Sequence, residues 1–244
     1  MRRETQNLLL LLLGGAVLKI ALTGTYVRYV KPSLLPWLIA AAAVTVGLAL
    51  FAIFRDIRAA QRGVADTGDC REHGTRSPWM LLLPVFAIFL VAPPALGADA
   101  VTRAGDGSRV PDRPSSAEMF PELPPGDAPL LSVSEFVTRV VWDDSGTLDG
   151  RPIRLRGFVV HPEQEGPTQL ARLRVNCCAA DAAPIRVDLA GAAAKRSSTL
   201  AADTWIEVTG TLRTGSATEA NGQVPTLEIT QLRRIAPPQD PYEY

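Results

Sequence analysis

Three long apolar runs in the first 97 residues constrain this chain more than any other feature. They extend over residues 8–27, 34–54 and 78–97. An α-helix rises about 1.5 Å per residue, so about 20 apolar residues cross the ~30 Å hydrocarbon core of a bilayer. We therefore expect residues 1–97 to form a transmembrane region with three helical spans.

The Lys and Arg residues of the short connecting segments predict how such spans are oriented. Seven of them precede the first run or lie between the second and third, whereas only Arg28 and Lys31 lie between the first and second. Because cytoplasmic loops carry the excess of basic residues, we expect a multi-pass protein of the cell membrane with a cytoplasmic N-terminus and an extracytoplasmic C-terminal half. Alternatively, the segment from Arg76 to Ala100 is a signal-peptide-like stretch whose cleavage releases the C-terminal half.

The C-terminal half begins with a segment that has too few large apolar residues to form a core. Residues 98–129 are rich in Pro, Gly and Ser, and we interpret them as a linker. The sequence Ser132-Val-Ser-Glu135 then has the spacing of a capping box, and apolar residues follow at helical intervals as far as Val141. This pattern predicts a short amphipathic helix.

From Arg151 onward the apolar period changes to two, which is typical of half-buried strands. Five strands are expected, at residues 153–159, 169–177, 183–189, 204–212 and 225–235. Gly157 and Gly210 fall inside two of them, where a β-bulge or a barrel corner needs glycine. We therefore predict an OB-like β-barrel domain over residues 130–238, followed by a tail at 239–244. A fragment of a β-sandwich is the alternative.

The distribution of charge argues against nucleic acid as a partner. Residues 98–244 hold 15 Lys and Arg against 20 Asp and Glu, so this half has no basic footprint for phosphates. The aromatic residues Trp142, Phe158 and Trp205 are therefore expected in the core rather than as a platform for bases. No phosphate-binding loop, zinc-protease motif or nucleophile elbow occurs in the sequence, and we expect no enzymatic activity.

The adjacent cysteines Cys177 and Cys178, followed by Asp181, are the most unusual local feature. Two thiolates and a carboxylate offer part of a tetrahedral metal shell, provided that a turn brings both sulfurs to one side. The cysteines could instead form a strained, labile vicinal disulfide in an oxidising compartment. A third interpretation is structural, because free cysteine packs as a small apolar residue.

Two histidines are further candidates for metal ligands. His161 ends the first strand and completes a shell only if it faces the cysteine pair, whereas a histidine before proline is more often a solvated loop residue. Cys70 and His73 form a Cys-x-x-His in the segment between the second and third runs, which is a weak signal with only two ligands. The predicted topology places this pair across the membrane from Cys177.

The chain resembles a known bacterial family, the YcgQ-like proteins, over nearly its whole length. The residues that carry the resemblance are Thr23–Pro32, Pro93–Gly97, Gly157–Val159, Trp205–Gly210, the closing peptide 237–244 and, above all, Arg174–Ala182. Members are described as the small subunit of a two-component membrane permease. The resemblance thus implies a partner, an integral membrane permease of the YcgR type, and it associates the family with metal-ion handling, with zinc as the metal.

Together these observations lead to two hypotheses about function. In the first, the chain is an accessory permease subunit in the lipid bilayer, and its outer β domain presents Cys177, Cys178 and Asp181 as a ligand-binding or gating element. In the second, it is a membrane-anchored thiol redox protein or sensor that uses the cysteine pair. The sequence assigns neither the transported species nor the direction of transport.

Overall fold

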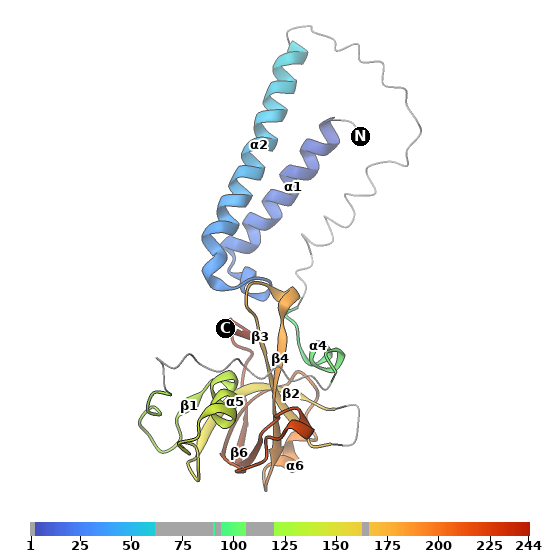
Figure 1. Ribbon diagram of the computed structural model, residues 1–244. Coiled ribbons are helices and arrows are strands. Elements are labelled where there is room, and N and C mark those ends of the chain that lie inside the picture. The colour runs from blue at the N-terminus through green and yellow to red at the C-terminus, as the bar shows by residue number, and fades with distance from the viewer. Residues whose placement is uncertain (1–2, 62–89, 91–93, 106–119, 163–165) are drawn as a thin grey trace. The chain divides into compact units, whose positions relative to one another are not determined.

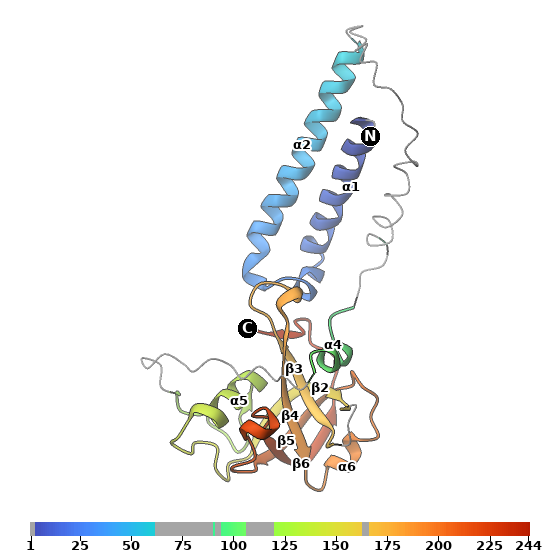
Figure 2. The same ribbon diagram turned by 45° about the vertical axis from the view of Figure 1, so that its right-hand side comes forward.

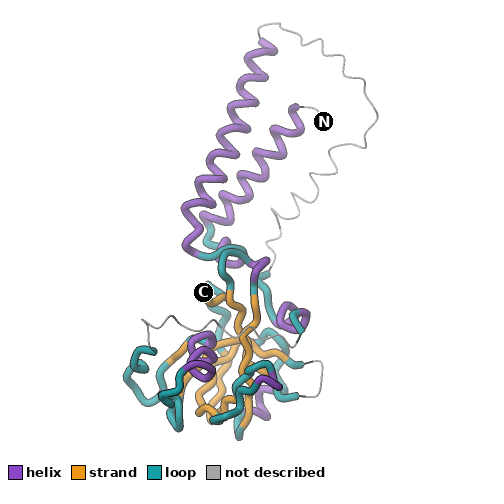
Figure 3. The backbone as a smooth tube through the Cα atoms, in the orientation of Figure 1, coloured by secondary structure: helices purple, strands orange, loops and turns teal. Residues whose placement is uncertain are grey.

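The computed structural model describes residues 3–61, 90, 94–105, 120–162 and 166–244. The chain divides into two compact units, residues 1–94 and residues 95–244. The first is helical and the second is built around β-strands, as the tube drawing in Figure 3 shows. Each unit is described by itself.

The first unit is an antiparallel pair of helices. Helix α1 (Arg3–Leu22) and helix α2 (Leu35–Gln61) lie side by side and are joined by the 3-10 turns η1 (Thr25–Arg28) and η2 (Pro32–Leu34) (Figure 1). Gly14 makes their close approach possible, since a Cβ there would lie 2.8 Å from a methyl group of Val46. At the other end of the pair, Asn7 donates a hydrogen bond of 3.1 Å to Asp56.

The expected three-span transmembrane region is wrong, because within the described residues one helix is long and apolar enough to cross a membrane. That helix is the 27-residue stretch Pro32–Arg58. Its large apolar side chains are exposed rather than packed in a core, with Trp37, Leu48 and Phe51 more than 60% exposed. The run at 8–27 does not form one span, because α1 ends at Leu22 and Gly24 adopts a left-handed conformation. Its apolar part, Gln6–Leu22, belongs to the shorter apolar helices.

The third expected span, 78–97, lies mostly outside the described residues. Its final residues belong to the β unit instead: Gly97 is the N-cap of helix α4 (Ala98–Arg103), which packs on the barrel. The Leu96 amide donates to the hydroxyl of Tyr242 at 3.0 Å, and the Ala98 amide donates to Asp203 at 2.6 Å. Specific hydrogen bonds to the barrel therefore hold this end of the apolar run, and Ala95 within the run and Ala98 just after it pack in a barrel cluster.

The second unit contains a closed five-stranded barrel, which confirms this part of the predicted fold. Its strands are β2 (Ile153–Val160), β3 (Gln169–Arg174), β4 (Ala183–Ala190), β5 (Trp205–Leu212) and β6 (Thr226–Arg234). They pair in the order β2-β5-β6-β4-β3, and β3 returns to β2 to close the barrel, as the turned view in Figure 2 allows one to follow. All five pairings are antiparallel except β4 with β6.

Gly157 and Gly210 lie where strands cross closely, as their positions inside the predicted strands suggested. A Cβ on Gly157 would lie 2.6 Å from the carbonyl oxygen of Ala171, and one on Gly210 would lie 2.4 Å from that of Glu228. The register between β5 and β6 shifts at Gly210, which is a β-bulge. Glycine therefore permits the sharp turns of the barrel wall that closure requires.

Two very short strands and several short helices flank the barrel in this unit. Helix α5 (Val133–Trp142) begins at the N-cap Ser132, whose hydroxyl accepts the Glu135 amide at 3.0 Å. This is half of the predicted capping box, because the Glu135 carboxylate accepts from Arg139 instead. Strand β1 (Leu130–Leu131) pairs with β2, and strand β7 (Tyr242–Glu243) pairs with β3, both in parallel. The expected linker at 98–129 thus contains α4, and the expected tail at 239–244 contains β7. The remaining short elements are α6 (Ala194–Ser197), η4 (Ala179–Asp181) and η5 (Glu219–Asn221).

Candidate functional site

The cysteine pair lies in the tight connection between β3 and β4. Strand β3 ends at Arg174, and the chain reverses through the 3-10 turn η4 before β4 begins at Ala183. Cys177 is exposed and Cys178 is half-buried, and neither forms a disulfide. Because the pair lies in a turn rather than in a strand, the alternation of side chains that would separate the two sulfurs does not apply.

Asp181 shapes this connection. Its carboxylate accepts backbone N–H groups from Asn176 at 2.9 Å and from Cys177 at 2.8 Å, and a longer contact from Cys178 at 3.5 Å. In return, the Asp181 amide donates to the Cys178 sulfur, which completes a capping box around η4. The segment Cys-Cys-x-x-Asp therefore stabilises its own turn, and it also supplies side chains that can bind a metal.

The two thiols and the carboxylate converge. One ligand atom from each of Cys177, Cys178 and Asp181 lies within 4.8 Å of the other two. Two thiolates on one tetrahedral zinc ion, each about 2.3 Å from the metal, lie about 3.8 Å apart. The three ligand atoms lie within 4.8 Å of one another, so their proximity fits a zinc ion with three protein ligands and an open position.

The electrostatics of the connection keep the exposed thiol protonated in the metal-free protein. The hydrogen bond between Cys177 and Asp181, with a further contribution from Cys178, raises the pKa of the Cys177 thiol to about 11. The same hydrogen bond, assisted by the backbone N–H groups, lowers the pKa of Asp181 even though burial acts in the opposite direction. Since the thiolate is the nucleophile in disulfide exchange, Cys177 is a poor redox nucleophile until a cation lowers its pKa.

The other candidate ligands lie elsewhere. His161 follows β2, where its Nε2 lies 2.8 Å from the carbonyl oxygen of Leu200. Val160 pairs with Gln169 at the start of β3, whereas Cys177 follows the end of that strand, so the histidine and the cysteine pair lie toward opposite ends of β3. Cys70 and His73 lie outside the described residues.

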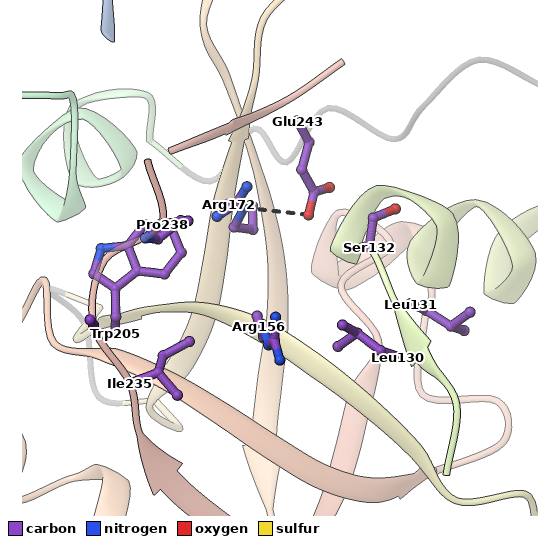
Figure 4. A pocket seen from close by; sticks show the side chains of 10 residues that line it. Leu130, Leu131, Ser132, Arg156, Arg172, Trp205, Ile235, Pro238 and Glu243 are labelled. Atoms are coloured by element: carbon purple, nitrogen blue, oxygen red, sulfur yellow. Dashed lines mark ion pairs between the residues drawn. The ribbon is translucent and has the colours of Figure 1, made fainter. Parts of the chain in front are cut away.

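Sequence reasoning missed a second site on the barrel. A cavity of about 580 Å³ is lined by Leu130, Leu131, Ser132, Arg156, Arg172, Trp205, Ile235, Ala236, Pro238 and Glu243. Figure 4 shows side chains from β1, β2, β3, β5 and β7 around it. Of the three aromatic residues expected in the core, Phe158 is buried, whereas Trp142 and Trp205 are half-buried. Trp205 lies at the cavity wall with its ring 5.7 Å from that of Phe158. The only signal in the sequence was an arginine inside the apolar strand β3.

Comparison with known proteins identifies two matching regions. The model of the DUF1980 N-terminal domain matches residues 5–104, and the model of the DUF1980 C-terminal domain matches residues 136–244. The first match covers the helical unit and extends through α4 of the barrel unit, and the second match covers the barrel. No curated protein and no solved structure matches the chain.

Proposed function

This chain belongs to the DUF1980 family, and we propose that it is a membrane-anchored accessory subunit of a permease whose barrel binds zinc through Cys177 and Cys178. The observation that carries the proposal is the convergence of two thiols and a carboxylate within 4.8 Å in an accessible turn. Three protein ligands with a fourth position open suit a site that exchanges its metal with a partner, because structural zinc sites are closed by four.

The membrane anchor in this proposal is α2. Its exposed apolar side chains suit contact with lipid or with the helices of a partner. A permease as the partner is the implication of the resemblance to YcgQ-like proteins. The exterior location of the barrel is part of the proposal, and it needs its own test because the count of Lys and Arg that predicted it assumed three spans. A topology reporter fused after Tyr244 tests that location: activity on the cytoplasmic face alone contradicts it.

Zinc binding to the full-length protein tests the metal site. We expect a chain reconstituted in nanodiscs to bind one zinc ion in competition with a chromophoric chelator, with release of protons. The variant with both Cys177→Ser and Cys178→Ser should lose this binding. Cys70→Ser is the matched control, since it removes the third cysteine and leaves the pair intact. Equal zinc binding by the double variant and the native chain removes the proposed site.

The partner is tested separately. A tagged native chain, extracted in mild detergent from the host membrane, should copurify with a larger integral membrane protein, and crosslinking should identify that protein. If the tagged chain runs alone under conditions that preserve other membrane complexes, the subunit proposal fails while zinc binding stands.

A second candidate function is a membrane-anchored thiol sensor. It is favoured by the two adjacent, unbridged cysteines, one of which is exposed. The raised pKa of Cys177 opposes it, because few thiolates are available at neutral pH. Mass-tagging in intact cells separates the two functions: a sensor shows loss of both free thiols after oxidant treatment, whereas full alkylation before and after oxidant excludes it.

A further inference from the structure

The second site begins where the barrel wall opens between β2 and β3. These strands pair only at the end of β2 that follows Gly157, with Phe158 opposite Ala171 as the last pair. Beyond that pair, β2 continues to Arg156 and is flanked by β1, while β3 continues to Arg172 and is flanked by β7. The cavity of about 580 Å³ lies at this opening, and its size is within the range of small-molecule sites.

Arginines outnumber carboxylates in the ion pairs at and beside the opening, and Asp240 also acts on the charge of Arg172. Glu207, which is almost fully buried, is the carboxylate partner of three arginines, Arg154 at 3.9 Å, Arg156 at 2.7 Å and Arg233 at 2.9 Å. The fourth arginine, Arg172, pairs with Glu243 at 3.4 Å. Among the ion pairs of the described residues, four guanidinium groups thus share two carboxylates, in a half of the chain where acidic residues outnumber basic ones.

Arg172 is a buried cation without full hydrogen bonding. It is 7% exposed and lies along the cavity. One terminal nitrogen donates to the Tyr242 carbonyl at 2.9 Å, whereas its Nε, although near Glu243, has no acceptor in hydrogen-bond geometry within the described part of the chain. A buried charged donor that lacks an acceptor is costly, and a further negative charge in the adjacent cavity would stabilise the guanidinium through space.

The Glu243 side chain is a carboxylate that the wall of this cavity stabilises. Its two oxygens accept the backbone N–H groups of Val133 at 2.9 Å and Ser134 at 2.7 Å, the first residues of α5. Those bonds orient the Glu243 carboxylate toward the helix N-terminus. The Arg156 and Arg172 side chains face the remaining space, as Figure 4 shows.

The other walls of the cavity are apolar. Leu130, Leu131, Ile235 and Pro238 line it. The Trp205 ring completes them, and the Arg172 guanidinium lies 4.8 Å from the centroid of that ring. This cation–π contact holds the arginine against a flat surface, on which an aromatic or aliphatic group can also pack. Charge and apolar surface are therefore adjacent within one cavity.

We propose that this cavity binds a small amphipathic organic anion, whose acidic group bonds Arg156 and Arg172 and whose apolar part lies against Trp205, Ile235 and Leu130. The site is independent of the cysteine pair, so it adds a second ligand to the barrel. Carboxylates and phosphate monoesters share the required chemistry, because both accept paired hydrogen bonds from guanidinium groups.

Three probes with a common apolar body test the proposal on the full-length chain in zwitterionic nanodiscs, with empty nanodiscs as the blank. They are naphthalene-2-carboxylate, 2-naphthyl phosphate and the neutral naphthalene-2-carboxamide, titrated by calorimetry. We expect one saturable site that prefers at least one anion over the amide by about tenfold, the size of one charge-assisted hydrogen bond. The better anion identifies the acidic group. Equal affinity for all three probes, or no saturable binding, overturns the proposal.

Variants then assign the residues. Arg156→Gln should weaken the anion about tenfold, and Ile235→Glu should weaken it through repulsion, while both leave the amide unchanged. Arg213→Gln is the matched control, since Arg213 forms an exposed pair with Glu228 away from the cavity. The variant with both cysteines replaced by serine should bind the anion normally, which separates this site from the zinc proposal. If neither Arg156→Gln nor Ile235→Glu changes anion affinity, the assignment is wrong.

Discussion

The two sites on the barrel differ in how the chain assembles them. The thiol site is built from a single turn of six residues, Asn176 to Asp181, and is held by backbone hydrogen bonds to one carboxylate. The arginine cavity takes its walls from five strands and is held by two ion pairs, of which the pair between Arg172 and Glu243 is buried. A site within one turn can therefore be predicted from the spacing of its residues in the sequence, whereas a site made by a change in strand pairing cannot. Four substitutions test this contrast, from the largest expected effect to the smallest.

Gly157→Ala should break the cavity and the barrel together. The added methyl group would overlap the carbonyl oxygen of Ala171, which is backbone and cannot move away without shifting β3. We expect the free energy of unfolding to fall by about 3 kcal/mol, at the upper end for overpacking. Denaturant unfolding followed by tryptophan fluorescence measures this change. Gly47→Ala is the control, because a methyl group there meets nothing within 4 Å, and an equal loss in both variants contradicts the explanation.

Glu207→Gln should act on the cavity charges without changing the thiol site. Burial raises the pKa of Glu207, but the hydrogen bonds from Arg156 and Arg233 outweigh it, so the pKa in the folded protein lies below the ordinary value of 4.5. The carboxylate therefore contributes stability above pH 4.5, and this contribution is lost as pH falls through the lowered pKa. We expect a cost of about 2 kcal/mol at pH 7.

The difference in stability between native chain and Glu207→Gln should then shrink as the native carboxylate protonates at acidic pH. Unfolding curves collected from pH 7 to pH 3 measure it. A constant difference across this range contradicts the assigned role of the ionised Glu207.

Asp181→Asn should have two opposite effects at the thiol site and none at the cavity. Loss of the carboxylate weakens zinc binding by about tenfold, as for other residues that orient or supply ligands. It also lowers the pKa of Cys177, because the hydrogen bond to Asp181 is the main cause of its rise. Iodoacetamide labelling of Cys177 at pH 8 should therefore become faster, since the thiolate reacts. Slower labelling contradicts the proposed electrostatics, and anion binding at the cavity is the internal control.

Ser132→Ala should have the smallest effect, about 1 kcal/mol of stability, from loss of the N-cap of α5. Glu243 still accepts two backbone N–H groups of that helix, so the helix should persist. Far-ultraviolet circular dichroism and thermal unfolding measure the effect. Zinc affinity should not change, whereas loss of zinc binding would show that the two sites are coupled.

Local patterns predicted much of the barrel. The N-cap at Ser132 and the period-two strands were recovered, because a helix cap and strand alternation depend on neighbours within a few residues. The Asp181 spacing also anticipated the converging ligand atoms, although the backbone bonds that make Asp181 a structural residue were not expected.

Hydropathy was a poorer guide to the helical unit. An apolar run shows that a segment is poorly solvated by water. Neither the length of the helix that it forms nor the partner on which it packs follows from composition. The run at 8–27 is divided at Gly24, and the end of the run at 78–97 is bonded to the barrel through Leu96. The left-handed conformation of Gly24 sets the first outcome locally, whereas a tertiary hydrogen bond decides the second.

By itself, the sequence determined the five barrel strands and helix α5, the glycines that allow close approach, and the presence of two thiols and a carboxylate within a five-residue stretch. The tertiary structure alone decided that Arg156 and Arg172 face one cavity and that Glu243, next to the chain end, caps a helix that begins 110 residues earlier. The physical reason is that spacing controls interactions along the chain, whereas partners across the barrel depend on strand order and on the opening between β2 and β3.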